Sequence, residues 1–141
     1  MMLKKLALFS TLTISLILLA GCNQSGPKTA VDLYNAGMIK YDAGNYKKAI
    51  EDFDKAIELD PKNAEIYNER AAAKHGLKDY SGAIADYSTS IELEPTNART
   101  YNSRGLGELY INQKEAGCAD LKKAATMGYD SSKSIMEKYC N

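Results

Sequence analysis

The histidine and cysteine side chains that most often serve as nucleophile, general base or metal ligand are few in this sequence, and they lie far apart along it. The chain of 141 residues has one histidine, His75, and three cysteines, Cys22, Cys118 and Cys140. The cysteines lack the paired C-x-x-C spacing of a zinc site, and the sequence has no glycine-rich phosphate loop. Two acidic clusters, one of Glu51, Asp52 and Asp54 and one of Glu92 and Glu94, are typical of solvated helix faces. The sequence therefore predicts a protein that performs no reaction and holds no metal or other cofactor.

The charge of the chain also bears on its partners. Lysine and arginine together number 18, and so do aspartate and glutamate. If residues 1–21 are removed, as argued below, Lys4 and Lys5 go with them and leave 16 basic against 18 acidic side chains. A nucleic-acid-binding domain usually carries a basic patch or stripe. We therefore expect no binding to nucleic acid.

The strongest pattern in the sequence is a repeat with a period of 34 residues. The stretch YKKAIEDFDKAIELDPKNA begins at Tyr46 and returns as YSGAIADYSTSIELEPTNA at Tyr80. Such a period indicates stacked units, each of which contacts only its neighbours. Apolar residues recur at three- and four-residue spacing, as on one face of a helix, and Pro61 and Pro95 end the second helix of each unit. The pattern predicts an all-α protein.

These residues resemble the tetratricopeptide repeat (TPR). The family pattern places Ala, an aromatic residue and Pro along the second helix, and here these are Ala49, Phe53 and Pro61, then Ala83, Tyr87 and Pro95. A third, looser copy has Tyr129 where the proline should be. The resemblance implies a helical solenoid with repeats at residues 30–63, 64–97 and 98–131, the third of them degenerate.

The third repeat and the residues after it carry two further expectations. Gly117 lies inside a predicted helix and costs about 1 kcal/mol of helix propensity relative to Ala, so we expect this repeat to be looser than the others. After the third repeat, the stripe of Ile135, Met136 and Tyr139 predicts a last helix, which makes residues 132–141 a capping helix. A solenoid needs such a cap over its final repeat. A frayed tail is the alternative.

The first 22 residues resemble a bacterial lipoprotein signal peptide. A short basic start precedes an apolar run from Leu6 to Ala20, which is too short for an ordinary membrane span. The four residues that end at Cys22 match the family's lipobox. The alternatives are an ordinary signal peptide with a chance cysteine and a retained N-terminal anchor.

This second resemblance implies a location. Residues 1–21 would be removed, Cys22 would receive a lipid, and residues 22–29 would tether the helical domain to a membrane. In a cell with two membranes we expect the outer membrane, on its periplasmic side. In a cell with one membrane we expect its outer face.

The TPR resemblance also implies a binding surface, because in that family the first helices line a concave groove for a peptide or a partner helix. The groove positions implied for this chain are Tyr34, Met38, Tyr41, Asn68, His75, Arg99 and Asn102. Ala72, Leu106 and Leu109 would face the groove beside them. The family's clamp for C-terminal carboxylates uses Lys, Asn and Arg at fixed places, which here hold Tyr34, Met38, Glu69, Arg99 and Ser103. Only Arg99 fits, which argues against the binding of carboxylate tails.

These expectations combine into one function. The chain is predicted to be a lipid-anchored adaptor of the cell envelope that binds a protein or peptide partner in its groove without catalysis. Two alternatives stay open. One is a non-catalytic subunit of an envelope assembly or polysaccharide machine, and the other is a structural oligomer built through the concave face.

Charged residues recur with the same period of 34. Aspartates at positions 52, 86 and 120 lie on second helices, and bases at positions 70, 104 and 138 follow each of them by 18 residues. We predict contacts across the repeat boundaries, namely Asp52–Arg70, Asp86–Arg104 and Asp120–Lys138. The alternatives are pairing within a repeat, Arg70 with Asp86 and Arg104 with Asp120, and coincidence on exposed faces.

The cysteines suggest a covalent link. With Cys22 lipidated, Cys118 and Cys140 remain, and an oxidising compartment favours their pairing. Cys118 lies near the start of one predicted helix and Cys140 at the end of the next, and consecutive antiparallel helices bring these ends together. We predict a disulfide. The alternative is two separate buried thiols.

Overall fold

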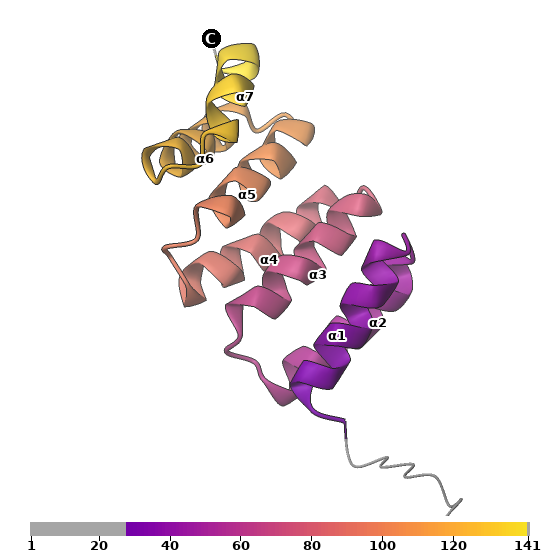
Figure 1. Ribbon diagram of the computed structural model, residues 1–141. Helices are drawn as coiled ribbons and strands as arrows, with labels where there is room; N and C mark the ends of the chain where they lie inside the picture. The colour runs from indigo at the N-terminus through magenta and orange to yellow at the C-terminus, as the bar shows by residue number, and fades with distance from the viewer. Residues whose placement is uncertain (1–27, 141) are drawn as a thin grey trace, which may run out of the picture.

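The computed structural model describes residues 28–140, and these residues form seven α-helices that pack in consecutive antiparallel pairs (Figure 1). The helices are α1 (Ala30–Asp42), α2 (Tyr46–Leu59), α3 (Ala64–Gly76), α4 (Tyr80–Leu93), α5 (Ala98–Tyr110), α6 (Lys114–Thr126) and α7 (Ser131–Tyr139). Each helix packs mainly on its neighbours along the chain. The prediction of an all-α solenoid is confirmed. The segment expected to be a signal peptide, and Cys22 after it, lie outside the described residues.

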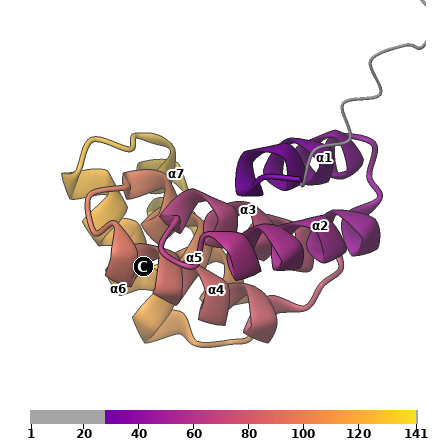
Figure 2. The ribbon, with the colours of Figure 1, turned by 90° about the horizontal axis from the view of Figure 1, so that it is seen from below.

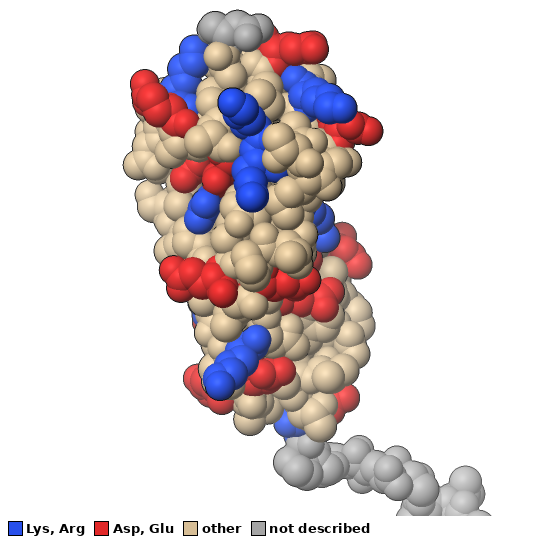
Figure 3. Space-filling view, turned by 90° about the vertical axis from the view of Figure 1, so that its left-hand side faces the viewer, with Lys and Arg blue, Asp and Glu red and all other residues tan. Residues whose placement is uncertain are grey.

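The stack is curved. Seen from below, α2, α4 and α6 follow the outer side of the curve, and α1, α3 and α5 lie on its inner side (Figure 2). The first helix and the last one lie at opposite ends of the stack (Figure 1). Figure 3 shows one long side of the molecule, where acidic and basic side chains are interspersed. Among the described residues, no helix is long and apolar enough to cross a membrane.

Side chains at the helix ends explain where the helices begin and turn. Thr29 caps α1, because its hydroxyl accepts from the Asp32 backbone N–H at 3.1 Å while its own N–H donates to the Asp32 carboxylate. Between the two helices of each repeat, one residue takes a positive φ. This residue is Gly44 at 73°, Lys78 at 64° and Asn112 at 61°. The third repeat therefore keeps the turn geometry of the first.

In each repeat the core sets a large side chain of the second helix, Phe53, Tyr87 or Leu121, among small ones. Phe53 is fully buried, and a Cβ built on Gly37 of α1 would lie 2.6 Å from its ring. Ala49 and Ala56 of α2 are fully buried as well. Small residues on facing helices let the backbones approach closely, which gives the dense packing that protein interiors need.

The third repeat is closely packed where its sequence predicts looseness. A Cβ built on Gly105 of α5 would lie 2.8 Å from the carbonyl oxygen of Gly117, and a Cβ built on Gly117 would lie 2.8 Å from that of Gly105. The two glycines thus bring α5 and α6 into backbone contact. Gly117 lowers the helix propensity of α6, but it permits this close approach of the two helices. The expectation that the third repeat is loosely packed is therefore wrong.

The predicted charge pairs Asp52–Arg70, Asp86–Arg104 and Asp120–Lys138 across repeat boundaries are wrong. Arg70 Nη2 lies 2.6 Å from the carboxylate of Asp86, and Arg104 Nε lies 2.6 Å from that of Asp120. Both contacts lie within a repeat. Lys138, assigned to Asp120, instead lies over the ring of Tyr139 at 5.0 Å.

The reason is the rotation of the second helix. Asp86 and Asp120 are buried and face the first helix of their own repeat. A residue two positions further along an α-helix points to the opposite side, and it is this residue that faces the next repeat. Arg70 therefore reaches Asp54 of α2 at 2.6 Å, and Arg104 reaches Ser88 of α4 at 3.1 Å.

Helix α7 covers the end of the stack. Its one buried residue is Ser132, whose hydroxyl donates to the Asn102 carboxamide of α5 at 2.8 Å. Cys118 of α6 and Cys140, which follows α7, form a disulfide with their Cα atoms 5.7 Å apart. The segment predicted as a cap is thus a helix that is joined to α6 both by packing and by a covalent bond.

Candidate functional site: the concave groove

Four of the residues that the family resemblance implied lie around one cavity on the inner side of the stack. Its volume is about 190 Å³. The side chains come from α1, α3, α4 and α5, and the lining residues are Tyr41, Asn68, Ala72, His75, Tyr87, Arg99, Ser103 and Leu106. This set is called the polar hollow below. Tyr41, Asn68, His75 and Arg99 were expected from the sequence. Ala72 and Leu106 lie on the same groove-facing side of their helices, Ser103 holds a clamp position, and Tyr87 is additional.

The remaining implied residues lie elsewhere. The Tyr34 hydroxyl donates to Glu65 at 3.0 Å beside a separate cavity near the start of α1. Met38 packs against the core cluster around Phe53. Asn102 is only 6 % exposed and lies beneath α7. Asn102 is therefore not among the residues that line the hollow.

Asn68 lines the hollow, but its amide is occupied by internal contacts. Its Oδ1 accepts from the Thr100 hydroxyl at 3.1 Å, and its Nδ2 donates to Glu69 at 3.0 Å. Asn102 makes the equivalent contact to Ser132 one repeat later. These asparagines thus join each first helix to the start of the next first helix. The family resemblance implied peptide binding for Asn68 and Asn102, whereas the contacts of their amides are structural.

Two opposite charges sit side by side at the hollow. The Glu69 carboxylate is buried and lies 3.3 Å from Nη2 of Arg99. The Arg99 side chain is 57 % exposed. A guanidinium carries five N–H donors in a fixed fork, and the contact with Glu69 engages one of its nitrogens. Arg99 can therefore donate to a bound acceptor while Glu69 neutralises its charge.

The tyrosines of the hollow are neutral hydroxyl groups at physiological pH. Burial raises the pKa of Tyr87 to about 12, and a hydrogen bond with Ser103 acts in the opposite direction. Burial also raises the pKa of Tyr41, and the charge of Glu69 adds to the effect. A neutral phenol both donates and accepts hydrogen bonds. The hollow therefore offers polar groups that suit peptide amides.

An aromatic cluster borders the hollow at the ends of α3 and α5. The rings of Tyr80 and Tyr110 are stacked with centroids 4.7 Å apart, and His75 packs edge-on against both, at 5.0 Å and 5.4 Å. Burial lowers the pKa of His75, which favours the neutral imidazole. Its Nε2 is buried and, among the described residues, has no hydrogen-bond partner. No pattern in the sequence predicts this pairing, because Tyr80 and Tyr110 lie on different repeats.

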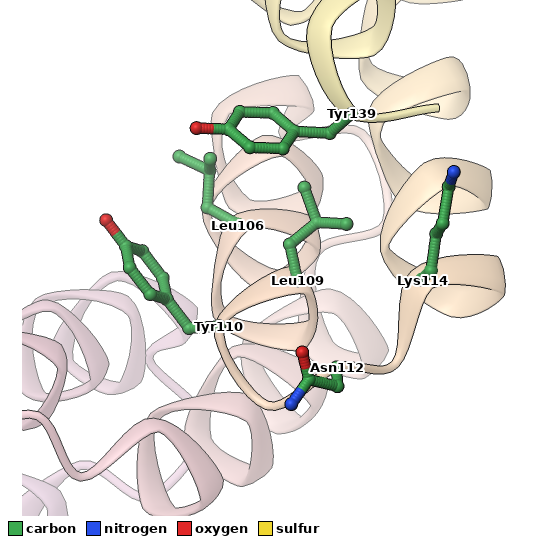
Figure 4. A pocket seen from close by; sticks show the side chains of 6 residues that line it. All are labelled: Leu106, Leu109, Tyr110, Asn112, Lys114 and Tyr139. Atoms are coloured by element: carbon green, nitrogen blue, oxygen red, sulfur yellow. The ribbon is translucent and has the colours of Figure 1, made fainter. Parts of the chain in front are cut away.

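A second cavity continues the inner surface toward α7. Its volume is about 300 Å³. Leu106, Leu109, Tyr110, Asn112, Lys114 and Tyr139 line it, and these residues are called the apolar hollow below. In Figure 4, Tyr110 and Tyr139 flank Leu106 and Leu109. Sequence reasoning placed the two leucines on the groove face and missed both tyrosines, since Tyr139 belongs to the cap.

The chain is similar to known proteins both in sequence and in fold. A model described as TPR repeat matches residues 37–78, and a model described as tetratricopeptide repeat matches residues 64–97. Together these two matches place tetratricopeptide-repeat sequence between residues 37 and 97. A search of the curated proteins finds no match to the sequence.

Solved TPR structures share the fold of this chain. The first TPR of Spaghetti (RPAP3) bound to the HSP90 peptide SRMEEVD is 22 % identical, with a TM-score of 0.77 over 79 % of this chain and 90 % of that one. The second TPR domain of human RPAP3 with the HSP70 peptide SGPTIEEVD is 21 % identical, with a TM-score of 0.76 over 79 % and 95 %. The TPR2B domain of yeast Sti1 in a complex with pHsp70 is 22 % identical, with a TM-score of 0.69 over 77 % and 87 %.

Proposed function

We propose that this TPR chain is a non-catalytic adaptor whose groove binds a protein or peptide partner. The observation that carries the proposal is the polar hollow itself. Residues from three successive first helices converge on it, among them Tyr41, His75 and Arg99. The solved TPR domains named above hold peptides, which supports a peptide ligand for the same fold.

The proposed partner is not an acidic tail of the kind that RPAP3 holds. The clamp positions of this chain provide one base, Arg99, and Glu69 lies 3.3 Å from it. A second carboxylate brought to Arg99 would face the charge of Glu69, and like charges at such sites are unfavourable. Neutral amides of an extended segment fit the donors and acceptors of the hollow better.

We further propose that the adaptor is held at the cell envelope by a lipid on Cys22. The lipobox that ends at Cys22 supports this location, and so does the disulfide between Cys118 and Cys140, because disulfides persist in exported proteins. Acyl chains contribute about 0.8 kcal/mol per buried methylene to membrane binding. The short segment between Cys22 and α1 would keep the TPR domain close to the membrane surface.

Site-directed crosslinking tests the groove. A photo-crosslinking amino acid placed at Ala72, in the hollow, should capture a partner in intact cells, and the same group at Lys47, exposed on the outer helix α2, should not. Arg99→Ala should reduce capture from position 72. Equal capture from both positions would contradict the proposal. A product with the mass of two copies of this chain would favour the structural oligomer instead.

A further inference from the structure

The polar hollow and the apolar hollow are parts of one continuous surface. Leu106 lines both of them. Leu106 and Leu109 stand 34 residues after Ala72 and His75, so they are the third-repeat equivalents of residues that line the polar hollow. The inner face therefore changes along its length from hydrogen-bonding side chains to leucines and tyrosines.

The apolar hollow has the features of an anchoring pocket. Tyr110 is 59 % exposed and Tyr139 is 46 % exposed, and they stand on either side of the leucines (Figure 4). Tyr110 is held in place by its stacking on Tyr80 at 4.7 Å. A fixed, exposed aromatic wall around aliphatic side chains is typical of the pockets that receive a partner's central apolar residue.

We propose that the apolar hollow binds a bulky apolar side chain, such as Leu or Phe, of the same segment whose polar part lies at Arg99. This inference rests on the proposed function of the groove. Its partner is thus a segment with hydrogen-bonding backbone or side chains next to one large apolar anchor. The polar hollow fixes the position of the segment, and the apolar hollow, which excludes water from the anchor, supplies much of the affinity.

Occupation by this chain's own N-terminal segment is disfavoured. That segment joins α1, which lies at the opposite end of the stack from α7 (Figure 1). A segment bound at Arg99, by contrast, reaches the apolar hollow across Leu106 without leaving the surface. Continuity with the groove therefore favours the partner segment as the occupant.

Selection from a library of random peptides displayed on phage tests the anchor, with the full chain purified without reductant. The selected peptides should share one bulky apolar residue at a fixed distance from a polar stretch. Tyr139→Ser should weaken their binding about tenfold, as the loss of a central contact does. Ile39→Ser, which removes an apolar side chain that is 72 % exposed and lines neither hollow, should leave it unchanged. The thermal unfolding of each variant checks that it is folded.

The possible results distinguish a failure of the anchor proposal from a failure of the proposed groove function. Selected peptides whose binding depends on Arg99 but not on Tyr139, or that share no apolar residue, would overturn the anchor and leave the proposed function standing. If no peptide is selected, the groove proposal fails and the anchor fails with it. If the chain forms a dimer that Tyr139→Ser dissociates, the occupant is a second copy and the anchor is overturned.

Discussion

At the scale of single residues, Glu108 breaks a charge pattern that the first two repeats keep. Lys40 of α1 pairs with Asp52, and Lys74 of α3 pairs with Asp86. The residue at the same place in the third repeat is Glu108, which is 8 % exposed and faces Asp120. Its Oε2 is buried and, within the described part of the chain, lacks a hydrogen-bond partner. A buried carboxylate beside another carboxylate is unfavourable.

The first prediction restores the lysine. Burial, and after it the charge of Asp120, raise the pKa of Glu108, although Arg104 acts against this. The folded chain therefore binds this proton more tightly than the unfolded chain, so stability falls as pH rises through the raised pKa. Glu108→Lys should increase the free energy of unfolding by about 1–2 kcal/mol at pH 7.

Denaturant titrations at two pH values measure this effect. The gain should shrink at a pH below the ordinary glutamate pKa, where Glu108 is protonated in both states. Glu115→Lys is the matched control, because it makes the same charge change on the exposed face of α6. An equal gain in the control, or a gain that does not depend on pH, would show that overall charge and not the site is responsible.

A second residue-scale prediction concerns Gly117. Alanine is a better helix former by about 1 kcal/mol, but its Cβ would lie 2.8 Å from the Gly105 carbonyl oxygen. Overpacking of this kind costs about 1–3 kcal/mol. Gly117→Ala should therefore lower the melting temperature. Ala116→Gly, at an exposed position one residue away, reports helix propensity alone. A stabilised Gly117→Ala chain would mean that α5 and α6 can separate at little cost.

At the scale of elements, α7 depends on few contacts. Ser132 is its one buried residue, and the disulfide is its covalent link to α6. A link between residues 22 positions apart contributes about 3 kcal/mol in the chain-entropy model. Because the first six helices pack without it, loss of the link should act first on α7.

The third prediction follows from this. The double variant Cys118→Ser with Cys140→Ser should lose hydrogen-exchange protection in α7 before any other helix, and its stability should fall by about 3 kcal/mol. Wild-type protein treated with reductant is the control and should behave in the same way. Alkylation of the untreated native protein, read by mass spectrometry, gives the direct answer. Full labelling of both cysteines would show that the bond does not form.

At the scale of the whole molecule, the repeat period predicts most of the fold. The period of 34 residues, the prolines after the second helices and the small residues on facing helices are local signals, and each repeat contacts only its neighbours. Helix α2 begins at Tyr46, where the repeated stretch begins, and ends at Leu59, just before Pro61. The cap was also visible, as an apolar stripe that ends at Tyr139.

Contacts that depend on rotation or on distant elements were harder to predict. The spacing of Arg70 and Asp86 is equally compatible with pairing within and between repeats, because a period fixes positions along the chain and not the direction of a side chain. Asn102 stands at a groove position by period, yet α7 covers it. The stacking of Tyr80 on Tyr110 joins two repeats, and no sequence pattern within either repeat predicts it.

The last prediction concerns how the molecule is held in the cell. If Cys22 carries the lipid, as we propose, several acyl chains would be needed for stable anchoring. Cys22→Ser should therefore leave an unprocessed precursor without lipid, while the groove variant Arg99→Ala should be processed and lipidated normally. The mass of the mature chain and its flotation with membranes measure the two steps. A Cys22→Ser chain that matures to the unlipidated wild-type mass would indicate an ordinary signal peptide. One that keeps its full mass and still floats would indicate a retained N-terminal anchor.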